Sequence, residues 1–379
     1  MIRKTVFWIH LACGVTAGIV ILMMSATGVL LTYERQVVAW AERSMHREPA
    51  GREARSIDAL VAAVEQQAPQ FRPTSVTVPR DPAAPVAVSA GRSRSLYVDR
   101  YTGEVLGEGA EGLRAFFDAV TGWHRWFNAE GDGRAIPRAI TGASNLMFLF
   151  LILSGMYLWL PRVYRWAAFK TRLLFNPRAE SGKARDFNWH HVFGIWSAIP
   201  LAVVVATAVV FSYGWANDLV YRSFGEEPPA RGRGGPPPAR TETARAEPAA
   251  FAPPLSLDAL LALAAAHSEA WNRITIPLPD AAATQVALTI DRGNGGQPQH
   301  RHTLVLDARS GEVLEWRPFS AESPGRRART LIRYLHTGEA LGLVGQTIAG
   351  LVSLTSLVMV WTGLALAYRR LIRPLLRQG

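Results

Sequence analysis

Four long runs without a charged residue interrupt an otherwise polar chain. They cover residues 5–33, 139–161, 187–217 and 340–368. Each run exceeds the about 20 apolar residues that an α-helix needs to cross about 30 Å of hydrocarbon. The pattern therefore predicts an α-helical integral membrane protein with four transmembrane helices. The first run is also longer than the apolar part of a cleaved signal peptide, about 7–15 residues.

Two long polar stretches separate the first run from the second and the third run from the fourth, and both show the same order of patterns. Each begins with an amphipathic helix, "SIDALVAAVEQQ" or "SLDALLALAAAHSEAW". Strands with alternating apolar and polar residues follow. In "LYVDRYTGEVL" and "LVLDARSGEVL" the glycine is typical of a left-handed turn position. We expect two α+β modules, the second carrying a Pro/Gly/Arg-rich linker at residues 225–254 that cannot bury a core.

The distribution of positive charge predicts how the helices are oriented. The 379-residue chain has a formal charge of +11, and its basic residues concentrate at the N-terminus, between the second and third runs, and after residue 368. Short basic flanks of membrane helices stay in the cytoplasm. Both termini are therefore expected inside and both modules outside. The charge is explained by membrane topology and lipid contact, so we assign no nucleic-acid partner to it.

These patterns give one set of predicted boundaries. They are helix 1–33, first module 34–138, helix 139–161, basic cytoplasmic loop 162–188, helix 189–215, second module 216–339, helix 340–368 and cytoplasmic tail 369–379.

The chain is also an internal repeat. "ATGVLLTY" at Ala26–Tyr33 aligns with "ATAVVFSY" at Ala206–Tyr213, an offset of 180 residues. Later segments align at an offset of 208, and "SGMYLWLPR" from Ser154 falls on "TGLALAYRR" from Thr362. Each half is one helix, one module and one returning helix. Because both halves enter the membrane from the same side, the repeat is parallel.

The repeat sorts the histidines into pairs. His10 and His190 occupy equivalent positions, each with a glycine four residues later, Gly14 and Gly194. That spacing places both residues on one helix face, where the glycine leaves room for a flat group. His191 is the alternative to His190. On the outer side, one histidine from each half precedes the second helix of that half, His124 and His336. Their alignment in the repeat is shifted by four residues, so this equivalence is weaker.

The two hairpins between membrane helices, together with the H-x-x-x-G that opens the first helix, resemble the PepSY-associated transmembrane family over essentially the whole chain. The resemblance implies a location in the bacterial inner membrane. It also implies the PepSY-like character of the modules and, for the ferric-siderophore reductases of that family, two b-type haems.

On this resemblance we expect His10 with His190 to bind an inner haem iron and His124 with His336 an outer one. The chain is then expected to be an oxidoreductase that carries electrons from the cytoplasm to a periplasmic ferric-siderophore and releases Fe(II). The short loop has no room for a flavin domain, so the donor would be a separate reductase or a reduced flavin. The alternatives are a membrane-anchored PepSY binding module without redox activity and a transporter.

Overall fold

The structure is a computed structural model that describes residues 1–49, 51–91, 94–229, 254–279 and 283–377. Most of the predicted linker, residues 230–253, lies outside the described residues. The chain divides into two compact units. The helical unit comprises Met1–Val37, Gly112–Val220 and Ala328–Gly379, and the sheet unit comprises Val38–Glu111 and Tyr221–Arg327.

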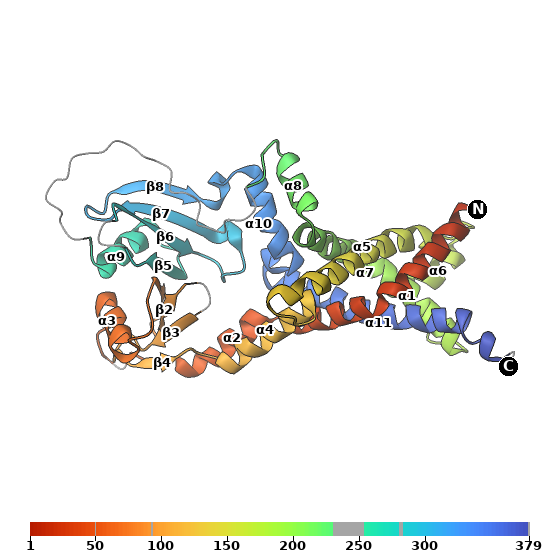
Figure 1. Ribbon diagram of the computed structural model, residues 1–379, viewed down its shortest axis with the longest axis horizontal. Coiled ribbons are helices and arrows are strands. Elements are labelled where there is room, and N and C mark those ends of the chain that lie inside the picture. Colours follow the sequence, from red (N-terminus) through yellow and green to blue (C-terminus); the bar gives the residue numbers. More distant parts are fainter. Residues whose placement is uncertain (50, 92–93, 230–253, 280–282, 378–379) are drawn as a thin grey trace. The chain divides into compact units, whose positions relative to one another are not determined.

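Four long helices form the core of the helical unit (Figure 1). They are α1 (Ile2–Leu31), α5 (Ala135–Trp159), α7 (Gly182–Ser212) and α11 (Gly342–Leu371). All four lie in segments long and apolar enough to cross a membrane. Both α1 and α7 pack against α5 and α11. Since the repeat relates α1 to α7 and α5 to α11, the two halves of the bundle are built alike.

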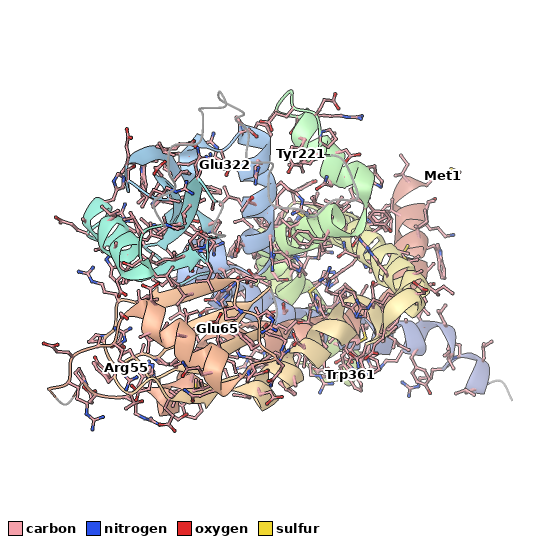
Figure 2. All side chains as sticks on the ribbon, turned by 60° about the vertical axis from the view of Figure 1, so that its left-hand side comes forward. Met1, Arg55, Glu65, Tyr221, Glu322 and Trp361 are labelled. Atoms are coloured by element: carbon pink, nitrogen blue, oxygen red, sulfur yellow. The ribbon has the colours of Figure 1, made fainter. Side chains whose placement is uncertain are left out.

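Side chains sort in this bundle as they do in a membrane protein. Large apolar side chains point outwards, such as Ile199, which is 74% exposed, and Trp361, which is 68% exposed and labelled in Figure 2. Polar side chains are buried between helices. The hydroxyls of Ser25 and Ser356 lie 2.6 Å apart, and Asn145 donates to the carbonyl of Val205 at 3.1 Å. Polar groups away from water need such partners.

The structure corrects several predicted helix boundaries: the second long helix begins at Ala135 rather than at residue 139, and the fourth ends at Leu371 rather than at residue 368. The third long helix begins at Gly182 rather than at residue 189, because the Ser181 hydroxyl caps it by accepting the Ala184 N–H. The predicted loop before it also contains a short helix, α6 (Trp166–Leu173). Asn188 fastens α6 to α7 by donating to the carbonyls of Thr171 and Leu174.

Shorter helices connect these elements. The α-helices among them are α2 (Glu34–Glu42), α4 (Glu111–Trp126), α8 (Gly214–Arg222) and α10 (Pro324–His336). The 3-10 turns are η1 (Arg43–Met45), η2 (Gly131–Arg134), η3 (Pro298–His300), η4 (Phe319–Ala321), η5 (Glu339–Leu341) and η6 (Leu375–Arg377). Of these, α4 and α10 matter most, because they precede α5 and α11 and carry the outer histidines.

The sheet unit is one antiparallel sheet of eight strands in the order β4-β3-β2-β1-β5-β6-β7-β8. Its strands are β1 (Ser75–Pro79), β2 (Val86–Ala90), β3 (Arg94–Val98), β4 (Val105–Gly107), β5 (Arg273–Pro277), β6 (Gln285–Asp291), β7 (Arg301–Asp307) and β8 (Val313–Pro318). The two predicted modules are thus not separate. Strands β1 and β5 pair, with Thr77 opposite Thr275, because joining two edges satisfies backbone groups that would otherwise be unpaired.

Two helices cover one face of this sheet, α3 (Ile57–Gln67) and α9 (Leu257–His267) (Figure 1). Each helix supplies the other with a cap. The Ile57 N–H donates to the Asp258 carboxylate at 2.8 Å, and the Leu257 N–H donates to the Asp58 carboxylate at 3.0 Å. This exchange ties the first half of the sheet unit to the second.

Candidate functional site

The first inner histidine is held by a hydroxyl on the neighbouring helix. His10 on α1 has its Nδ1 2.8 Å from the Ser154 Oγ on α5. The Ser154 hydroxyl already donates its own hydrogen to the carbonyl of Phe150 at 2.6 Å. It must therefore accept from the His10 Nδ1–H, which leaves the lone pair of the ring on Nε2.

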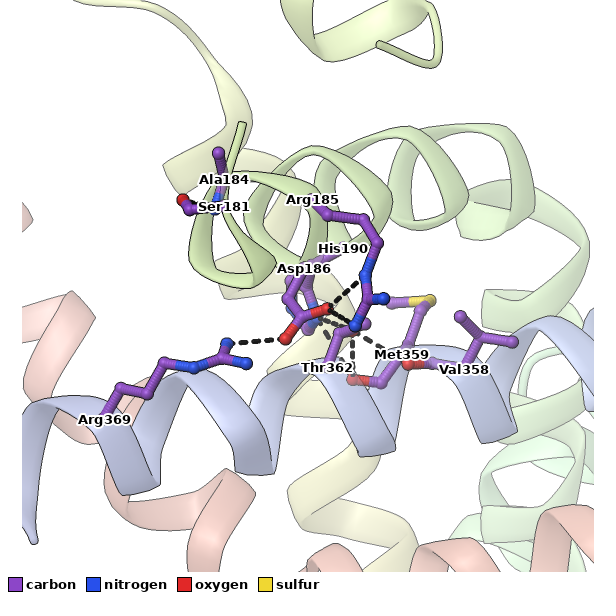
Figure 3. Close-up of polar contacts among 9 residues, drawn as sticks. All are labelled: Ser181, Ala184, Arg185, Asp186, His190, Val358, Met359, Thr362 and Arg369. Carbon is purple, nitrogen blue, oxygen red and sulfur yellow. Dashed lines mark hydrogen bonds and ion pairs between the residues drawn. The ribbon is translucent and has the colours of Figure 1, made fainter. Parts of the chain in front are cut away.

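The second inner histidine repeats this arrangement between α7 and α11 (Figure 3). His190 Nδ1 lies 3.0 Å from the Thr362 Oγ1 and 3.1 Å from the carbonyl oxygen of Met359. Thr362 donates its hydrogen to the carbonyl of Val358 at 2.8 Å. Nδ1 is again the donor and Nε2 again carries the lone pair, as ligation of a metal through Nε2 requires.

The outer histidines are held in the same way by the far ends of α1 and α7. His124 on α4 donates from Nδ1 to the Thr27 Oγ1 at 2.9 Å. His336 on α10 donates from Nδ1 to the carbonyl of Val204 at 2.9 Å, with the Thr207 Oγ1 at 3.3 Å. Both threonine hydroxyls donate to carbonyls of their own helices. The carbonyl acceptors fix Nδ1 as the donor in His190 and His336, and the same tautomer fits the contacts of His10 and His124.

The outer pair also has the spacing that one metal ion needs. The ring centroids of His124 and His336 are 6.3 Å apart, with the planes inclined by 63°. An imidazole nitrogen lies about 2.0–2.1 Å from a bound metal, so rings on opposite sides of one ion have centroids about 6 Å apart. Burial, and then the neighbouring His336, lower the pKa of His124 to about 4. His124 is therefore neutral at physiological pH, the form that binds metals.

The four hydroxyl residues that contact the histidines occupy equivalent positions in the sequence repeat. Ser154 and Thr362 are equivalent at the offset of 208, and Thr27 and Thr207 at the offset of 180. Sequence reasoning missed them, although all four lie in the segments that reveal the repeat. The signal that finds them is a hydroxyl residue followed by glycine or alanine at matched positions in both halves.

The glycine in two of these dipeptides lies against a histidine ring. A Cβ added to Gly363 would lie 3.3 Å from the His190 Cε1, which is tight, so a side chain there would press on the ring that Thr362 orients. A Cβ added to Gly155 would lie 3.5 Å from the His10 Cε1, an ordinary van der Waals contact. The glycine therefore makes room for the imidazole in the second half only.

The glycines predicted from the sequence lie beside flexible side chains. A Cβ on Gly14 would lie 3.8 Å from Leu151, and one on Gly194 would lie 3.6 Å from Met359. The rival histidine has a different environment. His191 is half-buried and donates from Nδ1 to the carbonyl of Phe187 on its own helix at 2.8 Å. His190 is therefore the histidine that faces α11.

The inner and outer histidines lie at opposite ends of the bundle. From His10 to Thr27, the residue that holds His124, α1 advances 17 residues, and α7 advances the same number from His190 to Thr207. At 1.5 Å per residue this is about 26 Å. Two separate sites result, near the two ends of the membrane-spanning helices.

A buried carboxylate lies one turn before His190 (Figure 3). The side chain of Asp186 is 2% exposed and accepts hydrogen bonds from Arg185 at 2.9 Å and from Arg369 at 2.5 Å. This pairing links α7 to α11 beside the inner site. A buried ion needs such partners, because its desolvation is costly.

The histidine pairs suit a haem better than a bare metal ion. In the parts of the chain that the structure describes, no three His, Cys, Asp or Glu side chains group closely enough to hold one. Two protein ligands alone make a poor site for a free ion. A haem supplies four nitrogens itself and needs one or two axial ligands, such as imidazole. No described hydrogen bond occupies the Nε2 of any of the four histidines.

The model of the PepSY-associated TM region family matches residues 7–370. The chain belongs to this family. No curated protein matches the sequence at a significant level. Membership of the PepSY-associated TM region family, together with the four apolar helices, makes the chain a membrane protein. All four histidines lie within the matched range.

Proposed function

We propose that this protein is a di-haem electron conduit of the bacterial inner membrane. It would take electrons on the cytoplasmic side, from a reduced flavin or a separate reductase, and reduce a ferric-siderophore in the periplasm so that Fe(II) is released. One observation carries the proposal: four histidines, two at each end of the bundle, each have Nδ1 within 2.8–3.3 Å of a hydroxyl at a repeat-related position.

This arrangement supports one role for each histidine. His10 and His190 would hold an inner b-type haem, and His124 and His336 would hold an outer one. When bound, each haem would supply one-electron exchange between Fe(III) and Fe(II). Two imidazoles on one haem iron would leave it no open site, which favours electron transfer over oxygen chemistry. The hydroxyls fix the rings beforehand, so little rearrangement is needed on binding.

Charged residues near each pair suit the carboxylates of such a group. Arg125 directly follows His124, and Arg333 lies one turn before His336 on α10. These two would hold the propionates of the outer haem. On the other side, the basic flanks of the helices support the cytoplasmic placement of both termini.

The direct test is an optical spectrum of the detergent-purified full-length protein, oxidised and dithionite-reduced, with a pyridine haemochrome count. Two low-spin b-type haems per chain support the conduit. Alanine at His10 or His190 should remove one haem, and alanine at His124 or His336 the other. A colourless protein, produced with adequate haem supply, refutes the conduit and leaves a membrane-anchored binding module as the function.

A further inference from the structure

Four arginines gather at the end of the helical unit that holds the outer histidines. Arg125 lies in the last turn of α4, Arg134 ends η2, Arg138 lies in the first turn of α5, and Arg333 lies in the last turn of α10. The guanidinium groups of Arg125 and Arg134 lie over the same indole, that of Trp126, and Arg138 follows Arg134 by four residues. Within the described residues, none of the four forms an ion pair with a carboxylate.

Two kinds of contact hold the guanidinium groups of this cluster near one another. The guanidinium carbons of Arg125 and Arg134 lie 4.4 Å and 4.7 Å from the centre of the Trp126 ring. Thr141 on α5 donates its hydroxyl hydrogen to the carbonyl of Arg125 at 2.8 Å. The end of α4 is thereby fixed to α5, with two cations stacked on one indole.

The backbone at this point is strained as well. Phe127 and Asn128, directly after Trp126, have φ angles of 53° and 57°. They are the only residues other than glycine with positive φ among those that the structure describes. The Asn128 N–H donates back to the carbonyl of Gly122 at 3.0 Å, so these two residues end α4 and turn the chain towards η2. This turn brings Arg134 back over Trp126, and a bound anion would offset the repulsion between Arg134 and Arg125.

The number of arginines exceeds what the proposed haem requires. An outer haem would bring two propionates, for which Arg125 and Arg333 are closest in sequence to the histidines. Arg134 and Arg138 remain, and their described hydrogen bonds go to the carbonyls of Ala129 and Phe211 rather than to a carboxylate. They also lie on the side expected to face the periplasm, where basic residues close to helix ends are normally sparse.

We propose that Arg134 and Arg138, the two arginines that the propionates do not require, form a binding site for an anionic ferric chelate whose carboxylate groups are free to contact guanidinium. The inference rests on the proposed function and names the class of its substrate. Guanidinium forks bind carboxylates through paired, charge-assisted hydrogen bonds. Because Arg125 adjoins His124, a chelate bound here would lie beside the outer site.

The test uses gallium(III) citrate, a redox-inert anionic chelate, as the probe. Its binding to the haem-loaded full-length protein in phosphatidylcholine nanodiscs would be measured by isothermal titration calorimetry. Arg134→Gln and Arg138→Gln should each weaken binding about fivefold, and salt should weaken binding to the wild type. Arg222→Gln is the matched control, since it removes the same charge from the exposed end of α8, and it should leave the affinity unchanged.

A second arm separates the chelate from lipid headgroups, which offer phosphate to the same guanidinium groups. Binding should persist when the nanodiscs contain phosphatidylglycerol; its loss there would assign the cluster to lipid and overturn the proposal. Equal affinities of wild type, Arg134→Gln and Arg138→Gln would also overturn it. The haem count of the same samples is independent, so a haem-loaded protein that fails the binding test refutes the anion site and leaves the conduit intact.

Discussion

The sharpest prediction compares the hydroxyls that hold the two inner histidines. Ser154→Ala removes the single hydrogen-bond acceptor seen for the His10 Nδ1–H. Thr362→Val removes the equivalent hydroxyl from His190, but there the carbonyl of Met359 stays at 3.1 Å and can accept the same hydrogen. Both replacements preserve the shape of the side chain closely. The two halves of the repeat should therefore respond unequally.

The expected loss of haem affinity depends on how many hydrogen-bond acceptors each imidazole loses. A partly buried donor left without an acceptor costs about 1–3 kcal/mol, which corresponds to about 5- to 150-fold in haem affinity. This is the expected loss for Ser154→Ala. For Thr362→Val the remaining carbonyl should limit the loss to about fivefold. Loss of the acceptor also makes the imidazole less basic, so Ser154→Ala should raise the midpoint potential of the inner haem.

The assay is transfer of haem from each variant to excess apomyoglobin, followed in the Soret band, with a potentiometric titration of the same samples. Thr355→Val is the matched control, because the Thr355 hydroxyl donates to the carbonyl of Leu351 on α11 and no described hydrogen bond joins it to a histidine. If Ser154→Ala behaves like this control, or if Ser154→Ala and Thr362→Val have equal effects, the proposed role of the hydroxyls is wrong.

Three further predictions concern other residues. Alanine at His191 should leave both haems bound, whereas alanine at His190 should remove the inner one; a haemochrome count separates the two results. Asp186→Asn should lower the melting temperature strongly, because breaking a buried ion pair costs about 3–5 kcal/mol, and adding Arg369→Gln should restore part of the loss in a double-mutant cycle. The pKa of Asp258 is raised from its ordinary 3.8, chiefly by burial. The folded protein therefore binds this proton more tightly than the unfolded chain does. The contribution of the carboxyl to stability is lost as the pH rises from 3.8 through the folded pKa. The Asp258→Asn variant should therefore have a higher melting temperature than the wild type at neutral pH. Below pH 3.8 the two melting temperatures should be equal. A higher melting temperature for the wild type at neutral pH would contradict this.

The sequence by itself determined the membrane class and the repeat. Twenty or more apolar residues in a row have one stable solution in lipid, a spanning helix, so four such runs were enough. Chemistry-bearing residues repeated at fixed offsets could also be paired, as His10 with His190. The family resemblance read from the same residues is confirmed by the match over residues 7–370. The haem ligands, the acceptor and the orientation of the chain remain predictions.

The tertiary structure decided what the repeat alone could not. Hydrogen bonds between helices depend on which faces meet, and only packing showed that Ser154 faces His10 and that His191 bonds its own helix. The joining of the two modules into one sheet also depends on tertiary packing. Alternation predicts that β1 and β5 are strands but not that they pair, since strand pairing depends on where the rest of the chain brings the two edges. The arginine cluster, drawn from four separate elements, likewise exists only in the folded chain.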